Sequence, residues 1–149
     1  MTEPNEYMAN IAVDQGVDPL MDHLSIFGAP TFLDDGAAIE LRLEPFHMNG
    51  GGTAHGGLFM VLLDVVMACS TLDAELSCVT VELKSNFMRP GGVEGDLIKA
   101  RGFLRSRGRS LAFCDGEIRN EGGELLATAS GTFKYIKRPG SVDENPVRT

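Results

Sequence analysis

The chain has 149 residues, enough for one domain with a buried core and too few for several. Its 21 Asp and Glu residues outnumber its 13 Lys and Arg residues, which gives a formal net charge of −8. Phosphate groups are bound by basic surfaces, so this balance argues against nucleic acid or an anionic membrane surface as a partner.

The first residues, MTEPNEYMAN, are acidic and polar. A secretory signal needs a basic segment followed by an apolar run, so we expect a cytoplasmic protein in which residues 1–18 are an N-terminal extension. The segment from Pro19 to Phe27 places Leu20, Leu24 and Phe27 on one side. This spacing predicts a short amphipathic helix.

A β-hairpin is predicted next. Two short apolar runs, Thr31–Leu33 and Ala37–Leu43, flank the turn signal Asp34-Asp35-Gly36. The hairpin is followed by a glycine-saturated loop, NGGGTAHGG, from Asn49 to Gly57. Because glycine has no Cβ, backbone in such a loop can approach a ligand closely.

The loop leads into an apolar helix, predicted from Gly57 to about Leu72, that carries Asp64 near its middle. The helix is too short and too polar at its centre to cross a bilayer, so we expect a core helix and no membrane partner. Its first turn directs free N–H groups and the positive end of its dipole toward the glycine loop. Such an end stabilises a developing negative charge.

The remaining chain has the alternation of β-strands. The first strand sorts its side chains onto two faces, one with Val79, Val81, Leu83 and Phe87 and the other with Thr80, Glu82, Lys84 and Asn86. Three further strands are predicted at Gly95–Arg105, Ser110–Arg119 and Glu124–Tyr135. Short turns between them favour an antiparallel meander.

The fold class is therefore α+β, with an antiparallel sheet against one buried central helix in a single domain over residues 19–138. Residues 139–149 are polar and contain proline, so we expect a disordered tail. The three cysteines and three histidines lack the spacing of a metal site, which predicts no metal and reduced thiols without catalytic chemistry.

One ordered set of residues carries a family resemblance across about Pro19 to Lys137. The set comprises Asn49, Gly52, His55-Gly56-Gly57, Asp64, Val79-Thr80-Val81-Glu82-Leu83, Phe87-Met88-Arg89-Pro90, Gly95, Gly108 and Gly131-Thr132-Phe133. It resembles the hotdog-fold acyl-CoA thioesterases of the phenylacetate-pathway (PaaI-like) type. The resemblance implies a sheet wrapped around a long helix, an acyl-CoA substrate whose CoA is not a separate cofactor, and a dimer with composite sites that often pairs into tetramers.

Asp64 is the strongest catalytic candidate. An unpaired carboxylate among Leu62, Leu63, Val65 and Val66 would be costly if buried, so either a salt bridge or hydrogen bond justifies it, or a function does. The resemblance places the catalytic carboxylate here, as general base toward water or as nucleophile on the thioester carbon.

The glycine loop supplies the other candidates. The free amide of Gly56 suits an oxyanion hole, although Gly56 and Gly57 could simply permit close packing. The resemblance gives Asn49 a role in fixing substrate or water, against the alternative of a turn-forming side chain. His55 could bond the loop or polarise the carbonyl.

Helix geometry separates these groups. At 1.5 Å rise per residue, Asp64 lies roughly 12 Å along the helix from Gly56, which prevents both from acting on one carbonyl in one chain and rules out a dyad of His55 with Asp64. If both are catalytic, two helices must meet antiparallel about a two-fold axis. Thr80 matches a hydroxyl that positions water in the family, but strict alternation places it opposite Val79 and Val81.

Arginines beside the turns are candidates for the CoA phosphates, with surface charge as the alternative. The substrate-binding set is Gly57, Arg89, Arg105, Arg107, Gly108 and Arg109. A thiol with a pKa near 8.5 leaves without prior protonation, so one carboxylate and an oxyanion hole suit thioester hydrolysis.

The predicted function is a homo-oligomeric acyl-CoA thioesterase. Two alternatives stay open: a hotdog enoyl-CoA hydratase or dehydratase, and a non-catalytic acyl-CoA-binding module. The acyl group is not readable from the sequence, since apolar residues such as Phe59, Met60 and Met67 are more simply core residues.

Overall fold

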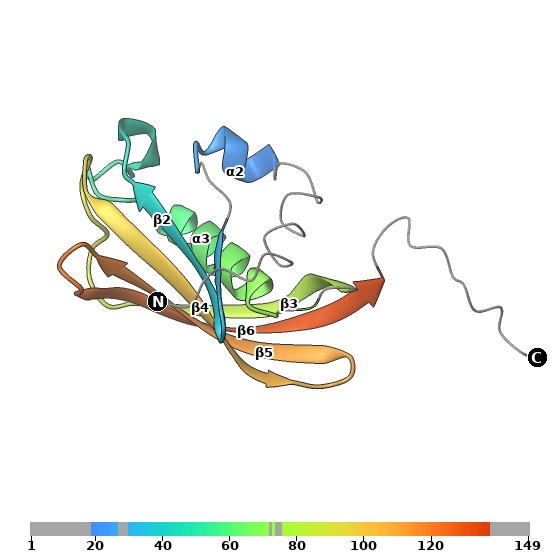
Figure 1. Ribbon diagram of the computed structural model, residues 1–149. Helices are drawn as coiled ribbons and strands as arrows, with labels where there is room; N and C mark the ends of the chain where they lie inside the picture. Colours follow the sequence, from blue (N-terminus) through green and yellow to red (C-terminus); the bar gives the residue numbers. More distant parts are fainter. Residues whose placement is uncertain (1–18, 27–29, 72, 74–75, 138–149) are drawn as a thin grey trace, which may run out of the picture.

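The computed structural model describes residues 19–26, 30–71, 73 and 76–137 (Figure 1). The expected N-terminal extension and C-terminal tail lie outside the described residues, as do Phe27 and Leu72 at the ends of the two predicted helices.

The strands form one antiparallel sheet in the order β1-β2-β4-β5-β6-β3. Their bounds are β1 Thr31–Leu33, β2 Gly36–Arg42, β3 Leu76–Phe87, β4 Leu97–Arg107, β5 Leu111–Asn120 and β6 Leu125–Lys137. The predicted β1–β2 hairpin and the β4–β5–β6 meander are confirmed, with small shifts at the strand ends.

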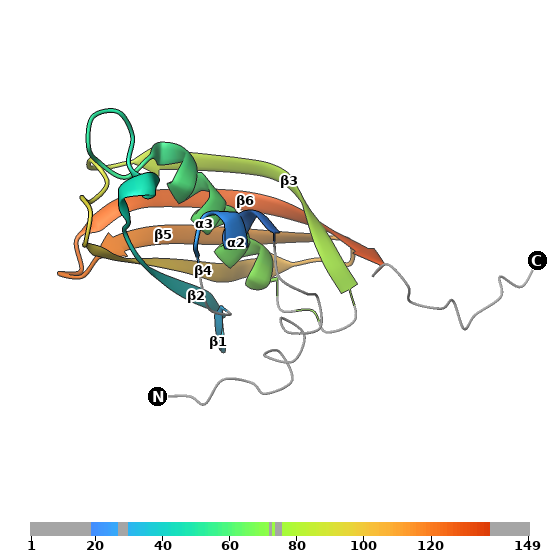
Figure 2. The same ribbon diagram turned by 90° about the horizontal axis from the view of Figure 1, so that it is seen from above.

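Helix α3, Gly56–Cys69, crosses one face of the curved sheet (Figures 1 and 2). It buries one apolar side against the strands, with the side chains of Leu58, Phe59, Leu62, Leu63, Val66 and Met67. The contact is direct at Gly102, where a Cβ would lie 2.4 Å from the Val66 carbonyl oxygen and from Ser70 Oγ. The predicted α+β arrangement around a central helix is therefore confirmed.

Helix α2, Pro19–His23, is shorter than predicted. Ser25 adopts a left-handed conformation with φ of 53°, and the amide of Ile26 reaches back to the carbonyl of Met21 at 2.9 Å. This arrangement ends a helix while satisfying its last carbonyls. A short 3-10 helix that was not predicted, η1 Pro45–His47, follows β2.

Strand β3 contains a β-bulge that overturns the predicted alternation. Thr80 pairs with Phe133 and Glu82 pairs with Thr132, so Val81 is the extra residue. Because Phe133 is fully buried beneath the helix, Thr80 also faces the helix, on the same side as Leu83. Thr80 does lie opposite Val79, as predicted, but its predicted place on the face of Glu82 and away from Leu83 was wrong, since one extra residue reverses the side of everything beyond it.

β3 is also an edge strand. It pairs with β6 along one side, and no other strand of the described residues pairs with its second side. Val79 and Val81 on this strand are 45% and 59% exposed. A long edge with exposed apolar side chains is a template for pairing with another strand.

Candidate active site

The carboxylate of Asp64 is held by one hydroxyl. Thr80 Oγ1 donates a hydrogen bond of 2.7 Å to Asp64 Oδ1. No other described residue lies within hydrogen-bonding distance of this carboxylate. Asp64 is only partly buried, so the cost assumed for a fully buried charge does not apply, and its position on the open side of α3 leaves one oxygen available to a ligand.

His55 caps the first turn of α3. Its Nδ1 accepts the N–H of Gly57 at 2.8 Å, which assigns the ring proton to Nε2 in the neutral form. A Cβ on Gly57 would come within 3.0 Å of that nitrogen, so glycine here leaves room for the cap. The ring is exposed, and its Nε2–H is free to donate to a ligand.

The amide of Gly56 is the remaining donor of this turn. Leu58 and Phe59 direct their N–H groups to the His55 carbonyl, whereas no acceptor in the described part of the chain contacts the Gly56 N–H. A Cβ on Gly56 would lie 3.6 Å from the Phe87 ring, an ordinary contact. The glycine is therefore not required for packing, and its amide has the geometry of an unsatisfied helix N-terminal donor.

Asn49 organises the glycine loop. Its Oδ1 accepts the amides of Gly51 at 2.8 Å and Thr53 at 3.2 Å, and its Nδ2 donates to Thr53 Oγ1 at 3.0 Å. The backbone closes the same loop, with the Asn49 amide donating to the Thr53 carbonyl at 2.7 Å. These bonds show the turn-forming role that the sequence left open, and they fix the loop from which α3 begins.

Both halves of the site lie along β3 but at different ends. Gly56 is beside Phe87 at the end of the strand, and Asp64 is beside Thr80 toward its beginning. One chain therefore presents the amide and the carboxylate about 12 Å apart on α3. The structure brings Asp64 together with Thr80, and His55 together with Gly56 and Gly57, as two separate groups.

The predicted arginines are mostly engaged within the chain. Arg89 pairs with Glu124 at 3.5 Å and Arg105 pairs with Asp115 at 2.7 Å, and both arginines are exposed. No carboxylate of the described residues lies within ion-pair distance of Arg109, which is exposed next to Gly108 in the β4–β5 turn.

Arg107 has a structural environment that the sequence did not indicate. It forms an ion pair with Asp73, whose side chain is only 9% exposed, and lies 5.1 Å from the Tyr135 ring. Asp73 also accepts the Leu76 amide at 2.6 Å. Arg107 thus compensates a nearly buried carboxylate where the chain passes from α3 to β3, a role that spacing in the sequence could not reveal.

The cysteines show no arrangement suited to nucleophilic catalysis. Burial raises the pKa of the Cys114 thiol to about 12, with Cys78 and Asp115 nearby adding to the shift. Burial also raises the pKa of Cys78, whose Sγ lies 3.8 Å from the Ala68 carbonyl oxygen. No group of three or more His, Cys, Asp or Glu residues within the described ranges is placed to hold a metal ion.

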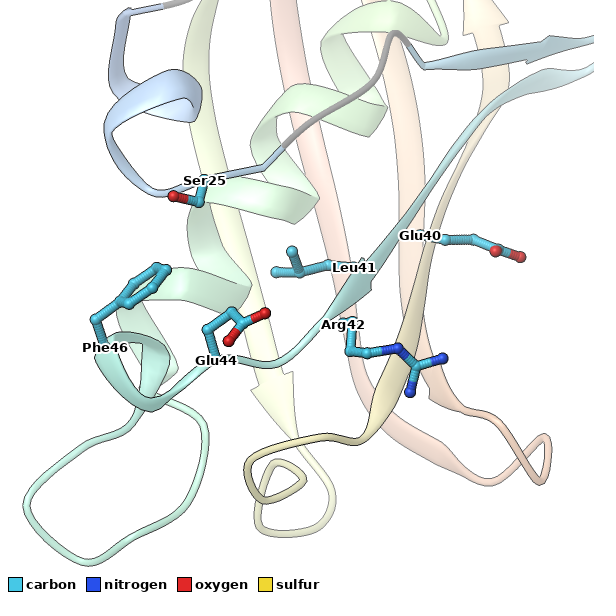
Figure 3. A pocket seen from close by; sticks show the side chains of 6 residues that line it. All are labelled: Ser25, Glu40, Leu41, Arg42, Glu44 and Phe46. Atoms are coloured by element: carbon cyan, nitrogen blue, oxygen red, sulfur yellow. The ribbon is translucent and has the colours of Figure 1, made fainter.

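Two pockets of about 360 Å³ each flank η1. The first is lined by Ser25, Glu40, Leu41, Arg42, Glu44 and Phe46 and contains none of the predicted site residues (Figure 3). Three of its lining side chains are charged. The second pocket is largely apolar and includes His55 and Gly57 in its wall, so it adjoins the start of α3.

Within the described ranges, no helix is both long enough and apolar enough to cross a membrane. The profile of the thioesterase superfamily matches residues 51–127, which contain Gly56, Asp64 and Thr80. "Putative esterase PA0474" of Pseudomonas aeruginosa is 34% identical over 119 residues, 77% of this chain and 87% of that protein.

Acyl-coenzyme A thioesterase 13 of Homo sapiens is 30% identical over 96 residues, 62% of this chain and 68% of that protein. The PaaI protein from the phenylacetic acid degradation operon of E. coli superposes with a TM-score of 0.76 at 24% identity, covering 87% of this chain and 92% of its own. The expected hotdog fold is confirmed by this likeness and by the strand order around α3.

Proposed function

The chain belongs to the thioesterase superfamily, and on this premise we propose that it hydrolyses acyl-CoA thioesters to the free acid and CoA. The observation that carries the proposal is the hydrogen bond from Thr80 to Asp64. It places a carboxylate and a hydroxyl together on the open side of the central helix. An acyl-CoA substrate is supported by the relative that is named an acyl-coenzyme A thioesterase.

Asp64 acts as general base in this proposal. Thr80 uses its one proton to bond Asp64 Oδ1, so the threonine oxygen can only accept further hydrogen bonds. A water molecule can then donate one proton to Thr80 and the other to the free carboxylate oxygen, with its lone pair directed at the thioester carbon. Because Thr80 and Asp64 can bind this water together, we favour a general-base role for Asp64. Direct nucleophilic attack by Asp64 would not need the Thr80 hydroxyl.

The Gly56 amide and His55 Nε2 serve as donors to the thioester oxygen. Both are free of acceptors in the described part of the chain, and the N-terminal end of α3 adds its dipole. With Nδ1 committed to the Gly57 amide, His55 is a hydrogen-bond donor and not a base. This arrangement disfavours a hydratase or dehydratase, in which histidine would take a proton.

The active site is shared between two copies of the chain. Asp64 on α3 is bonded to Thr80 on β3, the edge strand with exposed Val79 and Val81. Antiparallel pairing of two β3 edges about a two-fold axis would set the two α3 helices antiparallel, so that one Gly56 approaches the other chain's Asp64. The Gly56 amide and the Asp64 carboxylate, about 12 Å apart within one chain, would then meet across two chains.

The CoA phosphates would meet Arg109 and Gly108 of the β4–β5 turn. This turn lies at the end of the sheet opposite the glycine loop of the same chain, and the two-fold arrangement would bring it to the glycine loop of the second chain. Arg105 and Arg89 are in exposed ion pairs, which contribute little and can exchange a carboxylate for a phosphate. Arg107 is less suited to this role, because it compensates the Asp73 side chain, which is only 9% exposed.

The proposal is tested by measuring free thiol release from acyl-CoAs with short, medium, long and aryl acyl groups. The protein should release CoA from at least one of them, and the Asp64→Asn protein should not. Binding of an acyl-CoA without hydrolysis would identify a binding module. Hydration of an enoyl-CoA without thiol release would identify the hydratase alternative.

A further inference from the structure

The apolar pocket at the start of α3 is formed by three separate elements. Its apolar side chains are Leu24, which follows α2, Phe46 in η1 and Met48 after it, and Leu58 and Val61 on α3. The volume of about 360 Å³ falls at the small end of the range for ligand pockets. Its wall next to α3 is completed by His55 and Gly57.

The imidazole of buried His47 presents no free polar atom to this pocket. Its Nδ1 accepts the Glu44 amide at 2.9 Å, and its Nε2 donates to the Leu24 carbonyl at 2.5 Å. Both ring nitrogens are therefore occupied by backbone groups, and the ring is only 2% exposed. The pair of bonds also fixes η1 to the end of α2, so the pocket walls are held in place.

The lining decides which part of a thioester could enter. No Lys, Arg, Asp or Glu lines this pocket, whereas the CoA portion carries phosphates that require cationic or amide partners. An alkyl or aryl chain has no polar group to strip of water on entering such a lining, and it gains by leaving water. The acyl end of the substrate is the part that fits.

The pocket also begins where the carbonyl would bind. His55 and Gly57 in its wall are the residues on either side of Gly56, the proposed donor to the thioester oxygen. A carbonyl held at that amide thus has the pocket directly beside it. On α3 the pocket extends as far as Val61, which lies one helical turn before Asp64.

We propose that this pocket binds the acyl chain and sets the preferred chain length, with Leu24 and Val61 as the specificity-determining residues. This inference rests on the proposed thioesterase activity. It assigns the protein an apolar acyl group larger than acetyl, because a volume of about 360 Å³ lies in the range of small-molecule pockets.

The test compares two substitutions of the same kind on adjacent turns of one segment. Leu24→Phe fills the pocket, while Leu20→Phe alters a side chain that is 51% exposed and does not line it. We expect Leu24→Phe to lower the ratio of kcat/KM for decanoyl-CoA to that for acetyl-CoA by about 10-fold, as loss of apolar contacts should. Leu20→Phe should leave this ratio within about 2-fold of the wild-type value.

Val61→Phe provides a second filling variant on a different element, and circular dichroism establishes that each variant is folded. An unchanged ratio in folded Leu24→Phe and Val61→Phe, or an equal change in Leu20→Phe, overturns the pocket assignment while leaving thioesterase activity intact. Absence of thiol release from every acyl-CoA by the wild-type protein overturns the proposed function, and the pocket assignment with it.

Discussion

The hydroxyl of Thr80 donates a 2.7 Å hydrogen bond to Oδ1 of Asp64 and so joins the edge strand of the sheet to the middle of the central helix. The bulge at Val81 lets Thr80 before it and Leu83 after it share the face of β3 that lies toward α3. In the proposed mechanism the carboxylate is the catalytic base, and the threonine hydroxyl orients it.

The first prediction concerns the carboxylate. Asp64→Asn keeps the size of the side chain and its ability to accept the Thr80 hydrogen bond, but removes the base. We expect kcat for acyl-CoA hydrolysis to fall by at least about 100-fold while binding of a CoA thioether analogue is unchanged. Calorimetric titration with the analogue and thiol-release kinetics measure the two quantities. Turnover close to that of the wild type would remove Asp64 from the mechanism.

The second prediction concerns the threonine. Thr80→Val preserves the β-branched shape without the hydroxyl, and Thr80→Ser preserves the hydroxyl. Loss of one hydrogen bond to a charged group should lower kcat by about 10-fold or more in Thr80→Val, with KM little changed. Thr80→Ser should recover most of the rate. If both variants behave alike, the residue serves only the strand and not the carboxylate.

The third prediction separates two arginines that look equivalent in the sequence. Arg107→Ala leaves the nearly buried Asp73 carboxylate without its ion pair, which should lower the free energy of unfolding by about 1–3 kcal/mol. Arg109→Ala should leave stability unchanged and raise KM for acyl-CoA, but not for a pantetheine thioester that lacks the nucleotide phosphates. Urea denaturation and steady-state kinetics test the pair. A stable Arg107→Ala protein with a raised KM would restore Arg107 to the CoA site.

The fourth prediction uses the buried thiol of Cys114. Burial raises its pKa from 9.0 to about 12, so the folded protein favours the neutral thiol. The contribution of the neutral Cys114 thiol to the free energy of unfolding is fully present below about pH 9. It is lost as the pH rises toward 12, where the thiol of the folded protein also ionises. Unfolding free energy should therefore fall over this range, and less steeply in Cys114→Ala. Equal slopes in urea denaturation at several pH values would show that Cys114 does not contribute.

Much of the fold could be predicted because its signals are local. The Asp34-Asp35-Gly36 turn, the apolar helix after the glycine loop and the short turns of the meander each specify one element through backbone preference or periodicity. The end of α2 was missed because it depends on a left-handed serine, Ser25, that no residue preference demands. The 3-10 helix at Pro45–His47 was missed for a similar reason, since it is only one turn long.

The candidate site was predictable in its residues and less so in their contacts. Asp64 stood out as the charge in an apolar helix, and Gly56 as the residue that starts it. The contact with Thr80 was hidden because a bulge changes which face a residue occupies without changing the pattern of residue types. The pair of Arg107 with Asp73 joins residues 34 positions apart, and such pairing depends on the packed sheet.

The most direct test of the account asks whether Gly56 and Asp64 meet across two chains. Gly56→Pro replaces the amide proton with the proline ring and is compatible with the backbone, since proline is tolerated at the first helical position and His55 already has the extended conformation that precedes proline, with ψ of 132°. Gly56→Ala, which retains the N–H and meets Phe87 at 3.6 Å, is its matched control. Gly56→Pro and Asp64→Ala should each be inactive alone, and Gly56→Ala active.

When the Gly56→Pro and Asp64→Ala proteins are unfolded, mixed and refolded, about half of the dimers should contain one chain of each kind. In such a dimer one site carries both lesions and the other carries none, so about a quarter of the wild-type rate of acyl-CoA hydrolysis should return. No recovery in a preparation where mixed dimers are demonstrated by mass spectrometry would contradict a site shared between two chains.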